Sequence, residues 1–512
     1  MGRMYIRPGL PDDDNREYLP EKIKGSDIVV NENGNNSQPY PKRLEEFHGI
    51  IADDTEDEWY EYVPESYDPD KKTPLVLSMH GGLMTGWGQA IYTSWTMAAD
   101  RDGFIVVFPN ASVGRVWQVE WGRWESDPNQ PGTESNTQAP EGFLKSPEKI
   151  EDNHDVKLAL GLIERMKKKY NIDEERIFMQ GMSMGNMMTS LFARNFGNVL
   201  AGAAGSGCAT FLSLLFDENE KIKNKAGHLA VWQSRPELND IPPEKEEALK
   251  VNKYNRLYWM RLNECGAVPE ISIRGENNFA FYKGKKADLV YLDIKNRDHG
   301  QSLDDGALIW DYLFSGVRRK KDGSIVNTGS VRERKGDAFA MAFAAEKRLA
   351  WQNNSTVEMP GKAVRWEKLK YHGLDGGQKV RGAYICVPVS TLAGFFEAQC
   401  VYSENRLSAC LLLKDGRTLQ FARGSIGCVI DRELTAMYCE ALKRENELYI
   451  SAEWFCRYVF NLHVSACDDV IYITDHFNEL SVNMADLIRD ILNGTPVPDN
   501  YYDMLPEGGE EN

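Results

Sequence analysis

The residue of this sequence best placed to do chemistry is Ser183, which has a glycine two positions away on either side. The segment GMSMG (181–185) directly follows the apolar run Arg176–Gln180 and opens the amphipathic run Gly185–Phe196. A serine at such a strand-to-helix turn is typical of a nucleophile elbow, where glycines are needed because Cβ atoms would collide. We therefore predict that Ser183 is an exposed nucleophile. The alternative is a turn of small residues that lets a helix pack closely.

Two backbone N–H groups are candidates for stabilising the negative charge that such a nucleophile creates on a carbonyl oxygen. Met184 opens the following helix, and the first N–H groups of a helix lack partners within it. Gly82 belongs to a His-Gly-Gly turn after the apolar run Pro74–Met79. We predict that these two N–H groups form an oxyanion hole and that His80 orients the loop beside the substrate.

The general base is expected to come last in the chain order nucleophile, acid, base. His299 lies in the segment NRDHG after the apolar run Leu289–Ile294, and an imidazole exchanges protons near neutral pH. His228 is the alternative, but it begins a strand and would be partly committed to the sheet. We predict that His299 takes the proton of Ser183 during attack and returns it to the leaving alcohol.

The acid that orients this base is expected in the loop after the run Leu229–Gln233. Two carboxylates are available there, Glu237 and Asp240, in the segment SRPELND. Glu237 is nearer the strand end, whereas Asp240 is the commoner residue type for this role. We place Asp240 slightly ahead and keep both as candidates. Either could instead be a solvated surface acid.

Three tryptophans form a candidate substrate-binding group. Trp117, Trp121 and Trp124 lie close together, ahead of a stretch rich in Pro, Gly and Asn that ends near Pro140. Such a group can clamp an aromatic or polymeric substrate over the nucleophile, or it can pack an ordinary loop. Together with His80, these side chains are our candidate substrate-binding residues.

The candidate residues fall at the ends of strands in a regular alternation of strands and helices. This alternation predicts an α/β fold with a mainly parallel sheet covered by helices on both faces. Together with the elbow motif around Ser183, it indicates the α/β-hydrolase type. An edge hairpin is expected from Phe47–Ala52 and Trp59–Val63, and a closing helix from Ala307–Arg318. The other expected elements are the strands Pro74–Met79, Phe104–Phe108, Arg176–Gln180, Ala201–Gly205 and Leu229–Gln233 and the helices Asn153–Tyr170 and Gly185–Phe196.

The chain changes character near residue 320. Beyond it lie seven of the nine cysteines and short β-rich runs joined by turns, as around Asn353-Asn354 and LKDGRT. The segments YICVPVSTLAGFF and LYISAEWFCRYVF both read as a strand end followed by a short helix, which predicts a smaller α+β domain with internal repeats. The expected divisions are an irregular extension (1–45), an α/β-hydrolase catalytic domain (46–322), a linker (323–334), the α+β domain (335–495) and an acidic tail (496–512).

Composition argues against several classes of function. The 512 residues include 60 basic and 77 acidic side chains, and the formal charge of -17 opposes binding to nucleic acid or anionic lipid. No run approaches the roughly 20 apolar residues of a membrane span, and the N-terminus lacks the apolar core of a signal peptide. Nine cysteines without a C-x-x-C pair predict mostly buried free thiols rather than a zinc site. Without a phosphate-binding glycine loop or a metal-ligand motif, we expect no cofactor and no metal.

The first domain resembles the polyhydroxybutyrate depolymerase-like esterases, a group that includes feruloyl and acetylxylan esterases. The matching stretches, within about residues 55–316, are TPLVLSMHGG, WTMAADRDGFIVVFPN, ERIFMQGMSMG and the late DHG and IWDYL. The resemblance implies a cofactor-free carboxylic ester hydrolase, with Ser183 and His299 as nucleophile and base, acting through an acyl-enzyme on feruloyl, acetyl or hydroxyalkanoate esters. The acid loop departs from the family's His-Gly-x-x-Asp type. The rival hypotheses are a serine peptidase on the same scaffold and a non-catalytic surface binding protein.

The C-terminal part, about residues 335–490, resembles the copper amine oxidase N-terminal-like domain through ICVPVSTLAGFF, LKDGRTLQF and LYISAEWFCRYVF. Its cysteines and histidines show no ligand spacing, so the resemblance implies no copper. It implies attachment, substrate contact or self-association, and it suggests a secreted or cell-surface protein, with the cytoplasm as the alternative. The expected partner is a small-molecule or polymer-linked ester, with no nucleic acid and no membrane span.

Overall fold

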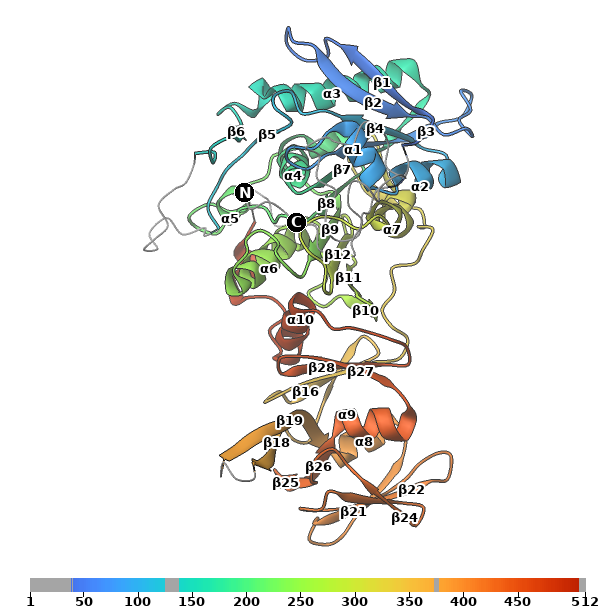
Figure 1. Cartoon of the computed structure of the whole chain (residues 1–512), viewed down its shortest axis with the longest axis vertical. Coiled ribbons are helices and arrows are strands. Elements are labelled where there is room, and N and C mark those ends of the chain that lie inside the picture. The colour runs from blue at the N-terminus through green and yellow to red at the C-terminus, as the bar shows by residue number, and fades with distance from the viewer. Residues whose placement is uncertain (1–37, 39, 125–137, 373–376, 506–512) are drawn as a thin grey trace. The chain divides into compact units, whose positions relative to one another are not determined.

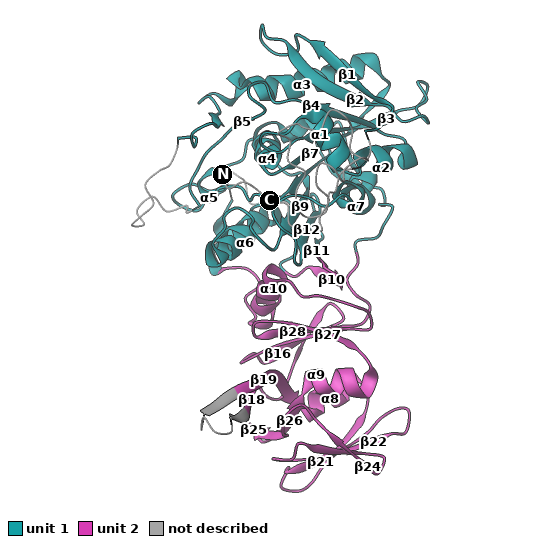
Figure 2. Ribbon diagram, viewed as in Figure 1, with its two compact units in different colours: residues 1–267, 281–334, 499–512 teal, residues 268–280, 335–498 magenta. Residues whose placement is uncertain are grey.

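The structure is a computed structural model that describes residues 38, 40–124, 138–372 and 377–505. The chain divides into two compact units, the first formed by 1–267, 281–334 and 499–512 and the second by 268–280 and 335–498 (Figure 2). Most of the expected extension (1–45) and the end of the acidic tail lie outside the described residues. Among the described residues, no helix has the length and apolar character needed to cross a membrane.

A mainly parallel sheet runs through the first unit (Figure 1). Its strands follow the order β1-β2-β4-β3-β7-β8-β9-β12, and every pair from β4 to β12 is parallel. Strands β3, β4 and β8 are buried along their whole length, as parallel strands covered on both faces must be. The strands are β1 (Leu44–Gly49), β2 (Asp57–Tyr62), β3 (Thr73–Met79), β4 (Ile105–Pro109), β7 (Ile172–Met182), β8 (Gly202–Ser206), β9 (Ala230–Pro236) and β12 (Leu289–Ile294). This architecture confirms the predicted α/β-hydrolase fold.

The expected edge hairpin is also present. Strands β1 and β2 pair in antiparallel register, with Phe47 opposite Trp59, and the two rings stack at 5.9 Å. Strand β2 then pairs with β4, which places the hairpin at one edge of the sheet. Trp59 is fully buried, so the hairpin is held to the sheet by apolar contact as well as by its backbone hydrogen bonds.

Helices surround this sheet in the first unit (Figure 1). Helix α4 follows β7 directly and contacts β7, β8 and β3, while α2 and α7 contact each other. The helices are α1 (Gly86–Tyr92), α2 (Trp95–Asp102), α3 (His154–Lys169), α4 (Met184–Phe196), α5 (Leu212–Leu215), α6 (Lys245–Leu262) and α7 (Asp305–Tyr312). The smaller elements are β5 (Gln118–Val119), β6 (Leu144–Lys145) and short 3-10 turns at Ile150–Asp152, Gly197–Val199, Phe314–Gly316 and Asp499–Asp503.

The closing helix differs from the expectation, because α7 ends at Tyr312 instead of Arg318. The chain then forms an antiparallel pair, β13 (Val317–Arg319) with β14 (Ile325–Asn327). The KKDGS segment is the turn of this pair, where Gly323 has a φ of 86° and the Asp322 carboxylate accepts from Ser324. The segment that we expected to begin the linker is thus a hairpin, since Asp-Gly favours a tight turn.

The second unit contains three antiparallel sheets and short helices, which confirms the smaller α+β domain. Their strand orders are β17-β16-β15-β28-β27, β18-β19-β26-β25 and β20-β21-β22-β23-β24. The first two sheets comprise β15 (Ala340–Ala344), β16 (Leu349–Gln352), β17 (Ser355–Glu358), β27 (His463–Cys467), β28 (Val470–Thr474), β18 (Val364–His372), β19 (Gly377–Pro388), β25 (Leu442–Arg444) and β26 (Glu447–Ser451). The third comprises β20 (Gln399–Tyr402), β21 (Ser408–Leu412), β22 (Thr418–Ala422), β23 (Gly427–Ile430) and β24 (Glu433–Ala436). Strand β10 (Glu270–Arg274) and helix α10 (Val482–Leu492) belong to this unit, and β11 (Asn277–Tyr282) spans its boundary.

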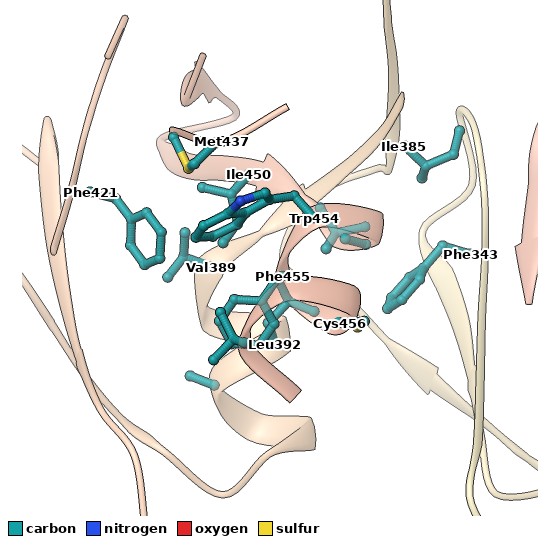
Figure 3. Close-up of a cluster of buried hydrophobic side chains, with 14 of the residues drawn as sticks. Phe343, Ile385, Val389, Leu392, Phe421, Met437, Ile450, Trp454, Phe455 and Cys456 are labelled. Carbon is teal, nitrogen blue, oxygen red and sulfur yellow. The ribbon is translucent and has the colours of Figure 1, made fainter. Parts of the chain in front are cut away.

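The two related segments of the second unit form the same strand–helix–strand unit. Strand β19 leads through α8 (Val389–Phe395) to β20, and β26 leads through α9 (Ala452–Trp454) and a π-helical turn to β27. Val389 and Leu392 from α8 face Trp454 and Phe455 in one buried apolar cluster (Figure 3). The internal repeat therefore contributes both short helices to this core.

All nine cysteines are free thiols, and five of them are buried, in agreement with the expectation of mostly buried thiols. The predicted hairpins around Asn353-Asn354 and around Gly416 are present as β16–β17 and β21–β22. Both asparagines and the glycine have positive φ angles, as these turns require.

Candidate active site

Ser183 occupies a strained turn between β7 and α4. Its φ of 53° and ψ of -116° lie outside the regions that residues with a Cβ normally adopt, at a cost on the order of 1–3 kcal/mol. The backbone N–H of Ser183 donates to the carbonyl of Ser206 at the end of β8, at 2.8 Å. The neighbouring strand therefore holds this turn in place.

The glycines on either side of Ser183 are required by close backbone approach. A Cβ on Gly181 would lie 2.0 Å from the carbonyl oxygen of Gly185, and one on Gly185 would lie 2.3 Å from that of Met79. Such distances are impossible for real carbon atoms, so neither position accepts a side chain without a backbone shift. The steric reason given for the GMSMG pattern therefore holds in this fold.

The structure brings Ser183, His299 and Asp240 into one hydrogen-bonded line. His299 Nε2 lies 2.8 Å from Ser183 Oγ, and His299 Nδ1 lies 3.0 Å from the Asp240 carboxylate. The serine follows β7, the aspartate follows β9 and the histidine follows β12, all at the carboxyl ends of parallel strands. His299 remains 29% exposed on its side chain, so a ligand can reach it.

The two candidate acids have different surroundings. Asp240 is 9% exposed, and the oxygen that faces His299 also accepts from the backbone N–H of Cys208 at 2.8 Å. Glu237 accepts from Lys295 Nζ at 2.9 Å and from the N–H of Asn296 at 3.1 Å. Glu237 thus braces the start of the loop that carries the histidine, and the geometry favours Asp240 as the acid.

His228 lies at the amino ends of the parallel strands, opposite the carboxyl ends that carry Ser183. It precedes β9, whereas His299 follows β12, and in parallel neighbours these positions are at opposite ends. The carbonyl of His228 accepts from Arg319, and burial lowers the pKa of its imidazole. The structure therefore places His228 away from the strand ends that carry Ser183.

The two candidate oxyanion donors lie next to each other. A Cβ built on Gly82 would be 3.4 Å from the sulfur of Met184 and 3.6 Å from its Cβ. Gly82 stands in the loop after β3, and Met184 is the first residue of α4. The two residues thus lie side by side on two elements, and their N–H groups stay the predicted oxyanion donors.

His80 is hydrogen-bonded within the loop that follows β3 and to the segment that follows β4. Its side chain is fully buried, Nδ1 donates to the carbonyl of Gly81 at 2.7 Å, and Nε2 accepts from the N–H of Ala111 at 3.0 Å. Burial lowers the pKa of this imidazole to about 4, so the ring is neutral near pH 7. These hydrogen bonds fit an orienting role for His80, which stays a prediction.

The expectation that Trp117 and His80 bind substrate is not supported, because both side chains are fully buried. The indole N–H of Trp117 donates to the carbonyl of His80 at 2.7 Å, and the two rings lie 4.6 Å apart. Trp117 therefore packs against the loop that follows β3. A buried tryptophan cannot be distinguished from an exposed one by spacing alone.

Trp121 and Trp124 are partly exposed and belong to an aromatic cluster with Phe143 and Phe211. Trp121 meets Phe143 edge-on at 5.7 Å, and Trp124 stacks on Phe211 at 4.0 Å. A Cβ on Gly82 would lie 3.8 Å from the Phe143 ring, so the cluster begins beside the candidate oxyanion hole. Sequence reasoning missed both phenylalanines, which come from separate loops with no motif of their own.

Asp305 is a third residue that the sequence did not reveal. Its side chain is fully buried at the start of α7, and its Oδ2 accepts from the hydroxyl of Ser206. Burial raises the pKa of the Asp305 carboxyl to about 7, although the hydrogen bond from Ser206 acts in the opposite direction. Because the carbonyl of Ser206 accepts from Ser183, this carboxyl lies two hydrogen bonds behind the elbow.

The described histidines, cysteines and acidic residues form no group of three or more that could hold a metal ion. The strand order, the elbow after β7 and the acid and base loops after β9 and β12 define the class of this chain as an α/β-hydrolase.

Curated proteins with similar sequences include two that are named as esterases. The chain is 29% identical over 144 residues to the bifunctional acetylxylan esterase/xylanase XynS20E of Neocallimastix patriciarum, covering 28% of this chain and 16% of that protein. It is 24% identical over 261 residues to feruloyl esterase B of Piromyces equi, covering 49% of this chain and 43% of that protein. The chain thus spans less than half the length of both relatives. No family model matches.

Similar solved structures include the acetyl xylan esterase from Aspergillus awamori, at 14% identity and a TM-score of 0.38, covering 52% of this chain and 97% of that one. Another is a ferulic acid esterase from Anaeromyces mucronatus in complex with ferulic acid, at 14% identity and a TM-score of 0.32, covering 53% of this chain and 94% of that one. At such low scores, these likenesses add nothing to the fold described above.

Proposed function

We propose that this chain is a serine carboxylic ester hydrolase that acts through an acyl-enzyme on Ser183. The observation that carries the proposal is the line of hydrogen bonds from Ser183 Oγ to His299, at 2.8 Å, and on to Asp240, at 3.0 Å. The similarity to proteins named acetylxylan esterase and feruloyl esterase supports the reaction type.

The proposed reaction begins when His299 Nε2 accepts the Ser183 proton as Oγ attacks the ester carbonyl carbon. The N–H groups of Met184 and Gly82 stabilise the oxyanion that forms. The imidazolium then gives its proton to the leaving alcohol, and water repeats the sequence on the acyl-enzyme. Asp240 keeps the proton of the neutral ring on Nδ1, so that Nε2 faces the serine, and it stabilises the imidazolium.

The acyl groups that best fit this site are acetyl and hydroxycinnamoyl, with hydroxyalkanoate esters as further substrates. The aromatic cluster of Trp121, Phe143, Phe211 and Trp124 supports a hydroxycinnamoyl group, because it begins at Gly82, beside the proposed oxyanion. Aromatic side chains bind an aromatic acyl group by stacking and edge contact. A small acetyl group needs no such surface.

The second unit is proposed to be an accessory module for attachment, substrate contact or self-association, in line with its resemblance to the copper amine oxidase N-terminal-like domain. All proposed catalytic residues come from the first unit. Inactivating the second unit should therefore change the hydrolysis rate of polymeric esters more than that of small soluble esters.

Labelling with a fluorophosphonate probe tests the nucleophile, because the probe reacts only with an activated serine. We expect the wild-type chain to be labelled and to hydrolyse methyl ferulate and 4-nitrophenyl acetate, and Ser183→Ala to lose both properties while remaining folded. Ser190→Ala is the matched control, since Ser190 lies on α4 and bonds Thr210.

Two outcomes would refute this proposal. Unchanged labelling and hydrolysis in Ser183→Ala would exclude this serine as nucleophile, and absence of labelling in the wild type would favour a binding protein. Faster cleavage of a peptide amide than of its matched ester would favour a serine peptidase.

A further inference from the structure

A groove of about 440 Å³ opens in the first unit between helix α2 and the loop that precedes helix α7. Met97 and Ala98 line it from α2, while Arg297, Leu303 and Asp304 line it from the loop. Small-molecule sites commonly span about 300–1,000 Å³, so the groove is large enough for one sugar unit. Met97 is 53% exposed, which leaves an apolar surface open to a ligand.

The groove shares a loop with the proposed general base. His299 stands in the loop between β12 and α7, and groove residues precede and follow it there. Asp304 is joined to Asp305, which accepts from Ser206, and the carbonyl of Ser206 accepts from the Ser183 N–H. The loop wall of the groove is thus connected to the elbow by two hydrogen bonds.

Arg297 provides a positive charge that is available to a ligand. The other groove arginine, Arg101, is occupied by hydrogen bonds to Asp102 and Asp311. Within the part of the chain that the structure describes, the Arg297 guanidinium forms no ion pair and no side-chain hydrogen bond, although its charge lowers the pKa of the buried Asp305 carboxyl. Asp304 is exposed on the same wall and forms no ion pair with Arg297 among these residues. A guanidinium without an ion-pair partner can bind a carboxylate through two parallel hydrogen bonds.

The proposed reaction decides which half of an ester lies near this groove. His299 must give its proton to the leaving oxygen, so the alcohol half has to lie on the histidine side. The proposed oxyanion donors and the aromatic cluster come from other segments, which meet around Gly82, Met184 and Phe143 and contribute no residue to the groove. The acyl half therefore belongs with the aromatic cluster and the alcohol half with the groove.

We propose that the groove binds the alcohol half of the substrate and that this half is a carboxylate-bearing sugar; the inference rests on the proposed ester hydrolysis. The sugar carboxylate pairs with Arg297, its hydroxyls donate to Asp304, and its apolar ring face lies against Met97 and Leu303. Only a ligand with both an anionic group and hydroxyl donors uses both charged side chains.

Paired esters test the assignment. Feruloyl esters of glucuronic acid and of glucose differ in one carboxylate, and we expect the wild type to have a KM about tenfold lower for the acidic ester, as one charge-assisted hydrogen bond would give. Arg297→Ala should remove this difference by raising only the KM of the acidic ester, and Arg297→Lys should restore part of it. Lys149→Ala removes an exposed positive charge elsewhere in the same unit and should change neither KM.

A binding measurement separates the groove from the chemistry. Saturation-transfer NMR on Ser183→Ala should detect glucuronate but not glucose, and the Ser183→Ala, Arg297→Ala double variant should lose the glucuronate signal. If the wild type hydrolyses none of these esters but glucuronate binding still depends on Arg297, the proposed function is refuted and the groove remains a site for a carboxylate-bearing sugar. Hydrolysis without acidic preference and without glucuronate binding would overturn the groove assignment alone. Preference for 3-hydroxybutyrate dimers over both sugar esters would also overturn it, since that alcohol half carries a carboxylate but is not a sugar.

Discussion

Replacing Asp305 with asparagine should remove a specific pH dependence from the stability of this protein. Burial raises the pKa of this carboxyl from 3.8 to about 7 in the folded chain. Between these two values the unfolded chain has released the proton and the folded chain has kept it, so stability falls as pH rises. The loss is about 1.4 kcal/mol per pH unit and about 4 kcal/mol in total, and it is complete above pH 7. The amide of the Asp305→Asn variant does not titrate in this range, so the variant should show none of this loss.

Urea unfolding of wild type and Asp305→Asn at pH 5, 6, 7 and 8 measures this effect. The variant should gain stability over the wild type by about 1.4 kcal/mol per pH unit from pH 5 to 7, with a plateau by pH 8. Contributions from the second unit cancel in this difference. Glu148→Gln is the matched control, because it removes an exposed acidic charge elsewhere in the first unit. A stability difference that stays constant from pH 5 to 8 would refute the reasoning.

Two further predictions concern the site itself. Asp240→Asn should lower kcat roughly ten-thousandfold, because the His299 tautomer would be wrong, whereas Glu237→Gln should have a much smaller effect; equal losses in steady-state kinetics would contradict the assignment of Asp240. Phe143→Ala should raise KM for methyl ferulate about tenfold, through the lost ring contact, and leave KM for 4-nitrophenyl acetate unchanged; a parallel rise for both esters would place Phe143 outside the acyl site.

The local features of the site could be predicted from the sequence because short-range sterics determine them. Ser183 needs small neighbours at fixed spacing, and the contacts of Gly181 and Gly185 show that the spacing reflects backbone collisions. His299 follows an apolar strand whose carboxyl end must meet the other strand ends in a parallel sheet. In each case, the residue type and the strand order were sufficient.

Features that depend on burial could not be predicted in this way. Asp305 looks like an ordinary residue at a helix start, and only the fold places its carboxyl against Ser206, away from water. Trp117 and Trp121 are four residues apart in one segment, yet one is in the core and the other is partly exposed. Phe143 reaches the same place from a different loop, a long-range contact that no local pattern encodes.

The choice between Glu237 and Asp240 shows where sequence reasoning reaches its limit. The Glu237 N–H still donates to the carbonyl of Ile294, so this residue continues the line of β9 and its side chain stays beside Lys295. Asn239 then adopts a φ of 51°, and the turned chain places Asp240 against both Cys208 N–H and His299. The residue nearer the strand end is therefore held by the strand, while the one beyond the turn reaches the imidazole. Distance along the chain favoured Glu237, whereas the direction of the backbone after the turn is what brings the Asp240 carboxylate to His299.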